Sequence, residues 1–305
     1  MSIVDQKPKV LATIGGIPLR LIVWMVGVSC VVALLSIGLI WPEVQFAPWF
    51  VVPLGPGTTL FVFAAALSCE YIDSTLGMGY GTTLTPLLLL AGFEPMQIVP
   101  AVLLSEFVTG LAAGVLHQRD GNVDFLRDRR VQRTAVQLSI LSVIRALAGV
   151  ALALQISKYW LTSIIATIVF SVGILILLTV RRQLRYRPGH IIALGGIAAF
   201  NKALSGGGYG PLVTGGQVVS GISGKSAVAI TSLAESLTCL IGLTAYLLAA
   251  QSLYWPLAVP LVGGALLSVP VATLTIRQIP ERFVRGSVGV TTCLLGLLMF
   301  VKLLA

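Results

Sequence analysis

The chain has 305 residues, of which 56% are hydrophobic and only 10% charged, and its formal net charge is +9. Soluble globular proteins carry about 25% charged residues, so most of the surface of this protein cannot face water. The composition, with a mean hydropathy of +0.97, indicates an all-α polytopic membrane protein and excludes a soluble enzyme, a secreted disulfide scaffold and a disordered chain. The basic residues lie in short loops between apolar runs, which is a signal of topology and not of nucleic-acid binding.

About seven apolar runs are long enough to cross a hydrocarbon core about 30 Å thick. The first run is too long for a signal-peptide core and lacks a small-residue cleavage site, so we expect it to stay as a spanning helix. The four cysteines fall inside apolar segments without paired spacing, and we interpret them as small buried hydrophobic side chains. The predicted spans are 21–40, 95–116, 134–155, 161–180, 225–250, 255–276 and 287–304.

Two other stretches, 58–92 and 190–222, begin as apolar helices, break at a glycine cluster and resume as a shorter apolar arm. The breaks read Gly-Met-Gly-Tyr-Gly from Gly77 and Gly-Gly-Gly-Tyr-Gly from Gly206. Glycine destabilises a helix by up to about 1 kcal/mol per residue. Broken backbone at membrane depth is tolerated only where protein buries it or water lines it. We therefore expect two re-entrant helical hairpins.

The two breaks belong to one internal repeat. A shift of 129 residues without a gap superposes both Gly-x-Gly-Tyr-Gly motifs and places a glutamate on a glutamate inside hydrophobic runs. The matched pairs include Gly79 with Gly208, Tyr80 with Tyr209, Gly81 with Gly210, Thr85 with Thr214, and Glu106 with Glu235.

The distribution of Lys and Arg predicts the orientation. Sixteen of the 20 basic residues lie in the N-terminal arm through Arg20, at 117–133, 181–190 and 277–286, and at Lys225, so these segments should face the cytoplasm. The N-terminus is then cytoplasmic and the C-terminus lies on the opposite side. Each repeat holds one hairpin and three spans, and because three is odd the second copy is inverted. The predicted organisation is an N-terminal span and outer loop at 1–57, repeat 1 at 58–180 and repeat 2 at 190–305.

Inverted repeats with broken helices are typical of secondary transporters, whose substrate sites lie near the midplane at the repeat interface. Glycine tips expose backbone N–H groups, and a helix that begins just after a break presents the positive end of its dipole, which favours an anion. Tyrosine and threonine hydroxyls beside the tips could bind an oxyanion or cap the broken helices. The candidate substrate-binding residues are Arg145, Lys202, Gly79, Tyr80, Gly81, Gly208, Tyr209, Gly210, Thr85 and Thr214.

Two of these candidates are cations at membrane depth, where an unpaired charge costs several kcal/mol. Arg145 lies near the centre of its span, and Lys202 lies four residues before the second glycine cluster. Each could contact the substrate, or could form an internal ion pair with a buried carboxylate. Asp73 is the repeat mate of Lys202, so these two residues could pair across the symmetry axis. The other carboxylates that could act as partners are Glu70, Glu106 and Glu235.

Glu106 and Glu235 occupy equivalent positions deep in their spans. A carboxylate buried there favours its protonated form and could carry a proton during transport. Alternatively, these side chains bond the backbone that is freed at the breaks, or contact substrate or a cation. With Asp73 and Glu70, they are the candidate coupling or gating residues. His117 and His190 are peripheral, and because the sequence has no metal-ligand spacing and no buried nucleophile–base pair, it predicts neither a cofactor nor an enzyme.

The segment Glu70-x-x-Asp73-Ser-Thr-Leu-Gly-Met-Gly-Tyr-Gly-Thr-Thr-Leu-Thr-Pro86, followed by Pro100-Ala-Val-Leu-Leu-Ser-Glu106, resembles the sulfite exporter TauE/SafE family. The second copy, Lys202-Ala-Leu-Ser-Gly-Gly-Gly-Tyr-Gly210 through Glu235, is similar to the second glycine-rich motif of that family. The resemblance covers essentially the whole chain. It implies a transporter in the cell inner membrane that moves sulfite, sulfoacetate or a related sulfonate.

The leading hypothesis is therefore a secondary transporter that binds one small anion between the hairpin tips and works by alternating access. Its partners would be the anion, the lipid bilayer and, where transport is coupled, a proton or cation. The alternatives are a passive anion channel and a transporter of a different small anion. With the cytoplasm negative, export of an anion needs no coupling ion, whereas import needs a symported proton or cation.

Overall fold

The computed structural model describes residues 13–14, 17–18, 54–125, 128–179, 188–219, 223–249, 252–275 and 281–304. The predicted span at 21–40 and most of the basic loop at 181–190 therefore lie outside the described residues. Residues 1–47 and 48–305 form two separate units. In the first unit, the described residues are β1 (Thr13–Ile14) and β2 (Ile17–Pro18), which pair antiparallel.

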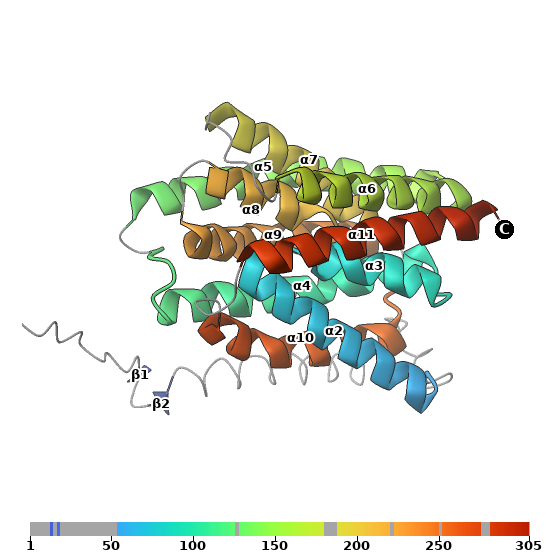
Figure 1. Cartoon of the computed structure of the whole chain (residues 1–305), viewed down its shortest axis with the longest axis horizontal. Helices are drawn as coiled ribbons and strands as arrows, with labels where there is room; N and C mark the ends of the chain where they lie inside the picture. Colours follow the sequence, from blue (N-terminus) through green and yellow to red (C-terminus); the bar gives the residue numbers. More distant parts are fainter. Residues whose placement is uncertain are drawn as a thin grey trace, which may run out of the picture. The chain divides into compact units, whose positions relative to one another are not determined.

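Helices make up nearly all of the described part of the second unit (Figure 1). Six of them are long and apolar enough to cross a membrane, namely α2, α4, α5, α6, α9 and α10, and α11 adds a shorter apolar stretch over 289–304. These helices agree with the predicted helical polytopic membrane protein. The bounds are α2 Pro56–Leu76, α3 Tyr80–Leu90, α4 Pro95–Arg119, α5 Arg129–Gln155, α6 Lys158–Thr179, α7 Pro188–Ser205, α8 Tyr209–Val219, α9 Gly224–Leu248, α10 Trp255–Thr275 and α11 Glu281–Leu304.

Both helix breaks lie at the glycine clusters. α2 ends at Leu76 because Gly77 adopts a left-handed conformation (φ 67°, ψ 29°), and its N–H still bonds the carbonyl oxygen of Asp73. Gly206 has the same sign of φ (73°) after α7. The arms that follow, α3 and α8, have 11 residues each. The arm before the first break is longer than half a membrane requires, because α2 has 21 residues and is one of the six candidate spans.

Packing between helices follows the sequence repeat. α2 packs on α10, and its repeat mate α7 packs on α5, which is the repeat mate of α10. α4 packs on its own mate α9, and α6 packs on its mate α11. A Cβ atom at Gly110 of α4 would meet the carbonyl oxygen of Ser232 in α9, so a small residue lets these two backbones approach closely. The two repeats therefore share one core instead of forming two separate bodies.

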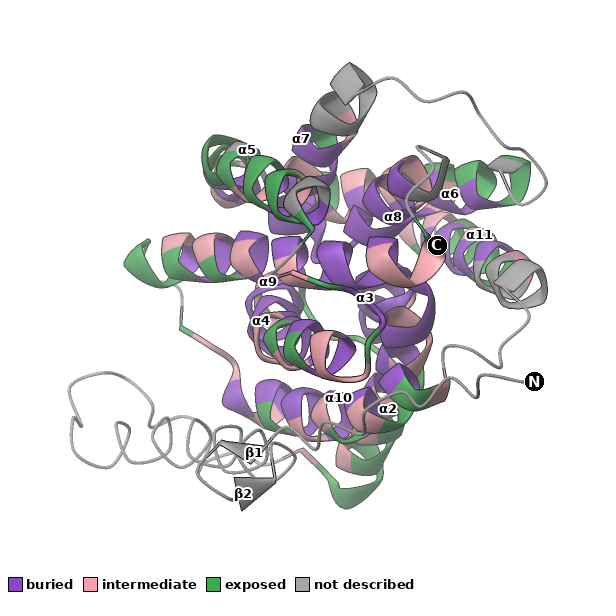
Figure 2. Ribbon diagram, turned by 90° about the vertical axis from the view of Figure 1, so that its left-hand side faces the viewer, coloured by how far each residue is buried: buried purple, intermediate pink, exposed green. Residues whose placement is uncertain are grey.

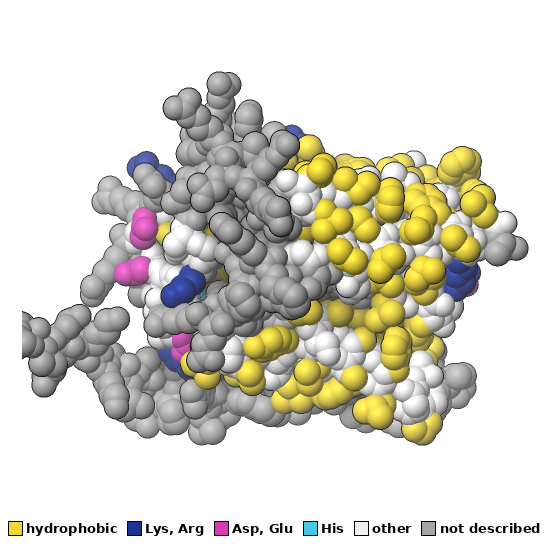
Figure 3. Space-filling view, viewed as in Figure 1, with side chains coloured by type: hydrophobic (Ala, Val, Ile, Leu, Met, Phe, Trp, Pro, Cys, Tyr) yellow, Lys and Arg dark blue, Asp and Glu magenta, His cyan; other side chains and the backbone are white. Residues whose placement is uncertain are grey.

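The buried core and the exposed surface fit a bilayer. Viewed along the helices, buried residues gather where α3, α4, α8 and α9 meet (Figure 2). The flank of the bundle carries large exposed hydrophobic side chains, whereas charged side chains gather near its ends (Figure 3). Ile140 and Ile144 of α5 are 67% and 78% exposed, and Leu178 of α6 is 64% exposed. Apolar exposure on this scale is expected of a surface that faces lipid.

Candidate functional site

The two glycine breaks touch each other across the repeat interface. The start of α3 lies against the second break, since a Cβ atom on Gly81 would overlap the carbonyl oxygen of Gly206. The start of α8 lies against the first break, since a Cβ atom on Gly210 would overlap the carbonyl oxygen of Gly77. Only glycine permits backbones to come this close. The crossed breaks thus place the positive ends of two short helices at the centre of the bundle.

Two threonines that are repeat mates line the crossed breaks, with different bonding. The hydroxyl of Thr214 donates to the carbonyl oxygen of Gly77 at 2.9 Å and shares a hydrogen bond of 2.8 Å with the hydroxyl of Thr231. Thr85 lies beside Gly206 in the same way. Its hydroxyl is buried and has no hydrogen-bond partner among the residues that the structure describes. The arrangement is therefore symmetric in position and asymmetric in hydrogen bonding.

A buried ion-pair cluster lies beside the second break. Lys202, in the last turn of α7, is 1% exposed, and its ammonium group contacts Glu106 Oε2 and lies 2.7 Å from Glu235 Oε1. Glu106 comes from α4 and Glu235 from α9, the two helices that pack on each other along the repeat axis. The thiol of Cys239 also lies 3.8 Å from Glu106 Oε2. One positive charge is thus shared by two carboxylates, and all three side chains are buried.

The other two candidate carboxylates bond elsewhere. Glu70 accepts a hydrogen bond of 2.6 Å from Ser74 and one of 3.2 Å from Thr109 of α4. Asp73 accepts the backbone N–H of Tyr80 at 3.3 Å and so caps the start of α3. Of the four carboxylates considered as partners of Lys202, Glu106 and Glu235 form the ion pairs that the structure describes.

Two further candidates differ in how close they come to this cluster. Tyr80 is fully buried, and its hydroxyl bonds that of Ser105, the residue before Glu106, at 2.7 Å. Arg145 is exposed on α5, where its guanidinium group lies directly over Gly196 of α7. The structure describes no contact between Arg145 and Lys202, so the role of Arg145 in substrate binding stays a prediction. The sequence predicted both cations to lie at membrane depth. In the structure, Arg145 lies on an exposed face of α5, whereas Lys202 is buried.

Sequence reasoning missed His117 and Tyr246, which support the broken helices. His117 Nε2 donates to the carbonyl oxygen of Ser74 at 3.1 Å, because its Nδ1 accepts from the amide of Asn122 at 3.1 Å. The hydroxyl of Tyr246 donates to the carbonyl oxygen of Ala203 at 3.1 Å. Both carbonyls lie in the last turn of an arm and lack an intrahelical donor. A shift of 129 residues superposes His117 on Tyr246 and Ser74 on Ala203, so the repeat itself held the signal.

The arrangement can hold and exchange charge. Within the described ranges, no group of three His, Cys, Asp or Glu side chains is arranged to hold a metal ion. The groups that the structure describes at the site are Lys202, its two carboxylates, the hydroxyl groups and the backbone of the crossed breaks.

Comparison with known proteins agrees with the resemblance seen in the sequence. The profile of the family described as sulfite exporter TauE/SafE matches residues 61–299, which include both breaks and the Lys202 cluster. The chain is 30% identical over 244 residues to the probable membrane transporter protein YtnM of Bacillus subtilis (strain 168), which covers 75% of this chain and 78% of YtnM. No solved structure matches the chain. The chain therefore belongs to the sulfite exporter TauE/SafE family, whose members are membrane transporters and not enzymes.

Proposed function

We propose that this protein is a secondary transporter that moves a small sulfur-containing anion, such as sulfite, sulfoacetate or a related sulfonate, across the cell inner membrane by alternating access. The family supports the substrate class. The single observation that carries the mechanism is the convergence of Lys202, Glu106 and Glu235 beside the crossed breaks. Carboxylates from both repeats meet one cation there, so a movement of one repeat against the other must change this cluster.

The charges of the cluster define how an anion would enter. With both carboxylates ionised, one lysine faces two negative charges, and this arrangement repels an anion. Once either glutamate takes up a proton, Lys202 keeps a single carboxylate and its other N–H groups can bind the substrate. The hydroxyl of Thr85, which is buried without a partner among the described residues, adds a donor beside Gly206. In this proposal each anion is accompanied by a proton, and the carboxylates serve as coupling residues.

The same proposal includes the topology. α2 with α3 and α7 with α8 are two re-entrant hairpins that enter from opposite sides, within inverted repeats at 58–180 and 190–305. Seven full spans, the 21–40 segment among them, complete the membrane domain. α2 of repeat 1 packs on α10 of repeat 2, and α7 of repeat 2 packs on α5 of repeat 1. This reciprocal packing supports the two-fold arrangement. The basic loops face the cytoplasm, which places the C-terminus on the other side.

Uptake of labelled sulfoacetate and sulfite into proteoliposomes tests the proposal, with and without an inward proton gradient. We expect saturable uptake that the gradient accelerates, and counterflow of labelled against unlabelled anion. Uptake that saturates but ignores the gradient would remove the coupling role of Glu106 and Glu235. Uptake without counterflow would indicate a channel, and no uptake of either anion would refute the proposed substrate class.

A further inference from the structure

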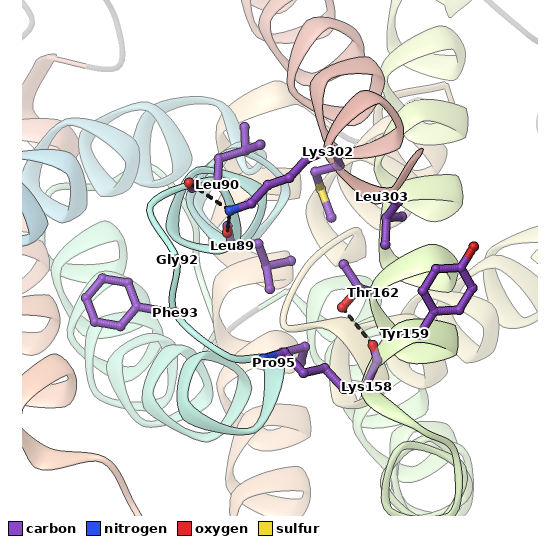
Figure 4. A pocket seen from close by; sticks show the side chains of 11 residues that line it. Leu89, Leu90, Gly92, Phe93, Pro95, Lys158, Tyr159, Thr162, Lys302 and Leu303 are labelled. Carbon is purple, nitrogen blue, oxygen red and sulfur yellow. Dashed lines mark hydrogen bonds between the residues drawn. The ribbon is translucent and has the colours of Figure 1, made fainter. Parts of the chain in front are cut away.

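A second site lies at the end of the bundle where α3 and α11 finish and α6 begins. A cavity of about 480 Å³ opens there, a volume typical of small-ligand sites. Its wall is mainly apolar and includes Leu89, Phe93, Met299 and Leu303; Thr162 also lines it, and its hydroxyl donates to the carbonyl oxygen of Lys158 at 2.8 Å (Figure 4).

Two lysines line this cavity, and their presence there is unusual. Of the 20 basic residues, 16 lie in the predicted cytoplasmic segments, and Arg145 and Lys202 lie inside helices. The remaining two are Lys158 and Lys302, which are 144 residues apart in the sequence, and both contribute to this cavity. Lys158 and Lys302 thus lie outside the predicted cytoplasmic segments, and both line the same cavity.

The two ammonium groups retain capacity for a ligand. Lys302 donates to the carbonyl oxygens of Leu89 and Leu90 at 3.0 and 3.1 Å, which leaves one of its three N–H groups (Figure 4). Lys158 pairs with Glu94 at 2.7 Å, but these two side chains are 65% and 55% exposed. An ion pair that is so exposed contributes little and exchanges readily.

The surroundings place this cavity at a membrane–water boundary. Lys158 is the first residue of α6, a candidate span, and Lys302 lies in the last turn of α11. Tyr159 and Trp160, which pack edge to face at 5.7 Å, are 54% and 63% exposed beside Lys158. Exposed aromatic residues at the end of a span are typical of the headgroup level.

We propose that this cavity binds one anionic phospholipid, with its phosphate between Lys158 and Lys302 and an acyl chain against the apolar wall. A small free anion could bind the lysines but would leave the apolar wall without a partner, whereas a zwitterionic lipid carries a cation beside its phosphate and gains less from the two lysines. The bound lipid would join the end of α3, one arm of the first break, to α6 and α11. The site is independent of the anion that is transported.

Native mass spectrometry of the full-length protein, with thermal unfolding in detergent, tests this site. Phosphatidylglycerol should bind one molecule per chain and raise the unfolding temperature, and phosphatidylcholine should not. Lys158→Gln and Lys302→Gln should each weaken phosphatidylglycerol binding about fivefold, the factor expected for one lysine near an anionic headgroup. Thr162→Phe should reduce binding while both lysines remain, because the larger side chain fills the cavity. Lys225→Gln is the matched control. Lys225 lies at the start of α9, away from the cavity, so this variant should bind phosphatidylglycerol as the unmodified protein does.

Lys302 also holds the end of α3, so its variant could lose stability for another reason. Lys158→Gln and Thr162→Phe avoid this ambiguity because neither residue bonds α3 in the structure. Equal binding of phosphatidylcholine would overturn the proposal. Equal stabilisation by inorganic sulfate would replace the lipid site with a site for small anions, and unchanged binding in both Lys158→Gln and Thr162→Phe would place the lipid elsewhere.

Discussion

Glu106 and Glu235, which are equivalent by the 129-residue repeat, contact the ammonium group of the same lysine, Lys202. The residue equivalent to Lys202 is Asp73, which instead caps α3. The repeats therefore supply matched carboxylates but a single cation. Because symmetry fails at the charged residue, the site cannot be electrically equivalent when viewed from its two sides. In the proposed mechanism, this difference lets an anion bind on one repeat and leave through movement of the other.

Replacement of Lys202 by methionine should abolish transport and destabilise the protein. The substitution leaves two buried carboxylates without their cation, and loss of one partner from a buried ion pair costs about 3–5 kcal/mol. Thermal unfolding in detergent measures the stability, and proteoliposome uptake measures the transport.

A neutral version of the cluster separates these two effects. The triple variant Lys202→Met, Glu106→Gln, Glu235→Gln removes all three charges, so most of the lost stability should return. Transport should stay absent, because no cation remains to bind the anion. Recovery of transport in the triple variant would show that Lys202 acts only through folding.

Single substitution of Glu106 or Glu235 by glutamine should uncouple transport from protons. Glutamine imitates the protonated carboxylic acid in shape and charge, so the anion can still bind Lys202. We expect counterflow of anion against anion to persist and acceleration by an inward proton gradient to disappear. A matched variant, Glu94→Gln, removes an exposed carboxylate at the end of the bundle and should leave the gradient effect intact. Full gradient sensitivity in both cluster variants would contradict the proposed coupling.

Thr214→Val and Thr85→Val should have different effects on stability although the two threonines are repeat mates. Valine keeps the shape of threonine and removes the hydroxyl. Thr214→Val leaves the carbonyl oxygen of Gly77 without its donor and should destabilise the protein by about 1–3 kcal/mol. Thr85→Val removes a hydroxyl that is buried without a partner among the described residues, so stability should be unchanged or higher. If Thr85 binds substrate, its variant raises the substrate concentration needed for half-maximal uptake; equal destabilisation by both variants would contradict the asymmetry.

The sequence predicted much of this architecture because its strongest signals are local. The two Gly-x-Gly-Tyr-Gly clusters predict helix ends, and α2 and α7 do end directly before Gly77 and Gly206. The sequence could not assign the partners of Lys202, since four carboxylates lie at similar depth and only three-dimensional packing selects Glu106 and Glu235. It also could not show that Arg145 is exposed and Lys202 buried, because a central position in a span does not reveal which face of the helix the rest of the protein covers.

The length of the first arm illustrates a similar limit. The sequence predicted a hairpin from 58 to 92, with the glycine cluster near its tip. α2 is nonetheless long enough to span by itself, because Pro56 can begin a helix and the helix continues through Glu70 and Asp73 to Leu76. Composition determines that such a segment is helical, but tilt and depth depend on its neighbours, here chiefly α10.

Tyr246→Phe should destabilise the protein, because the carbonyl oxygen of Ala203 loses its hydrogen-bond donor at the end of α7. The expected loss is about 1–3 kcal/mol, the cost of leaving a buried polar group unpaired.

His117→Leu should have a similar effect at the end of α2, where the carbonyl oxygen of Ser74 loses its donor. The thermal unfolding temperature of each variant measures the loss. Tyr254→Phe, at the start of α10, is the control and should change little; equal stability of all three variants would show that neither repeat mate supports its arm.

Alanine at the glycines where the breaks cross should disrupt the centre of the protein. A Cβ atom at Gly81 would overlap the carbonyl oxygen of Gly206, and one at Gly210 would overlap that of Gly77, so the backbones must separate. Overpacking of a well-packed interior typically costs about 1–3 kcal/mol, and here the obstacle is backbone that cannot rotate away. We expect lower unfolding temperatures and lost uptake for both variants. Gly57→Ala is the matched control, since a Cβ atom there meets nothing within 4 Å and alanine favours the first turn of α2. Normal stability of Gly81→Ala together with Gly210→Ala would mean that the two breaks do not touch, and the proposed anion site between them would have to be abandoned.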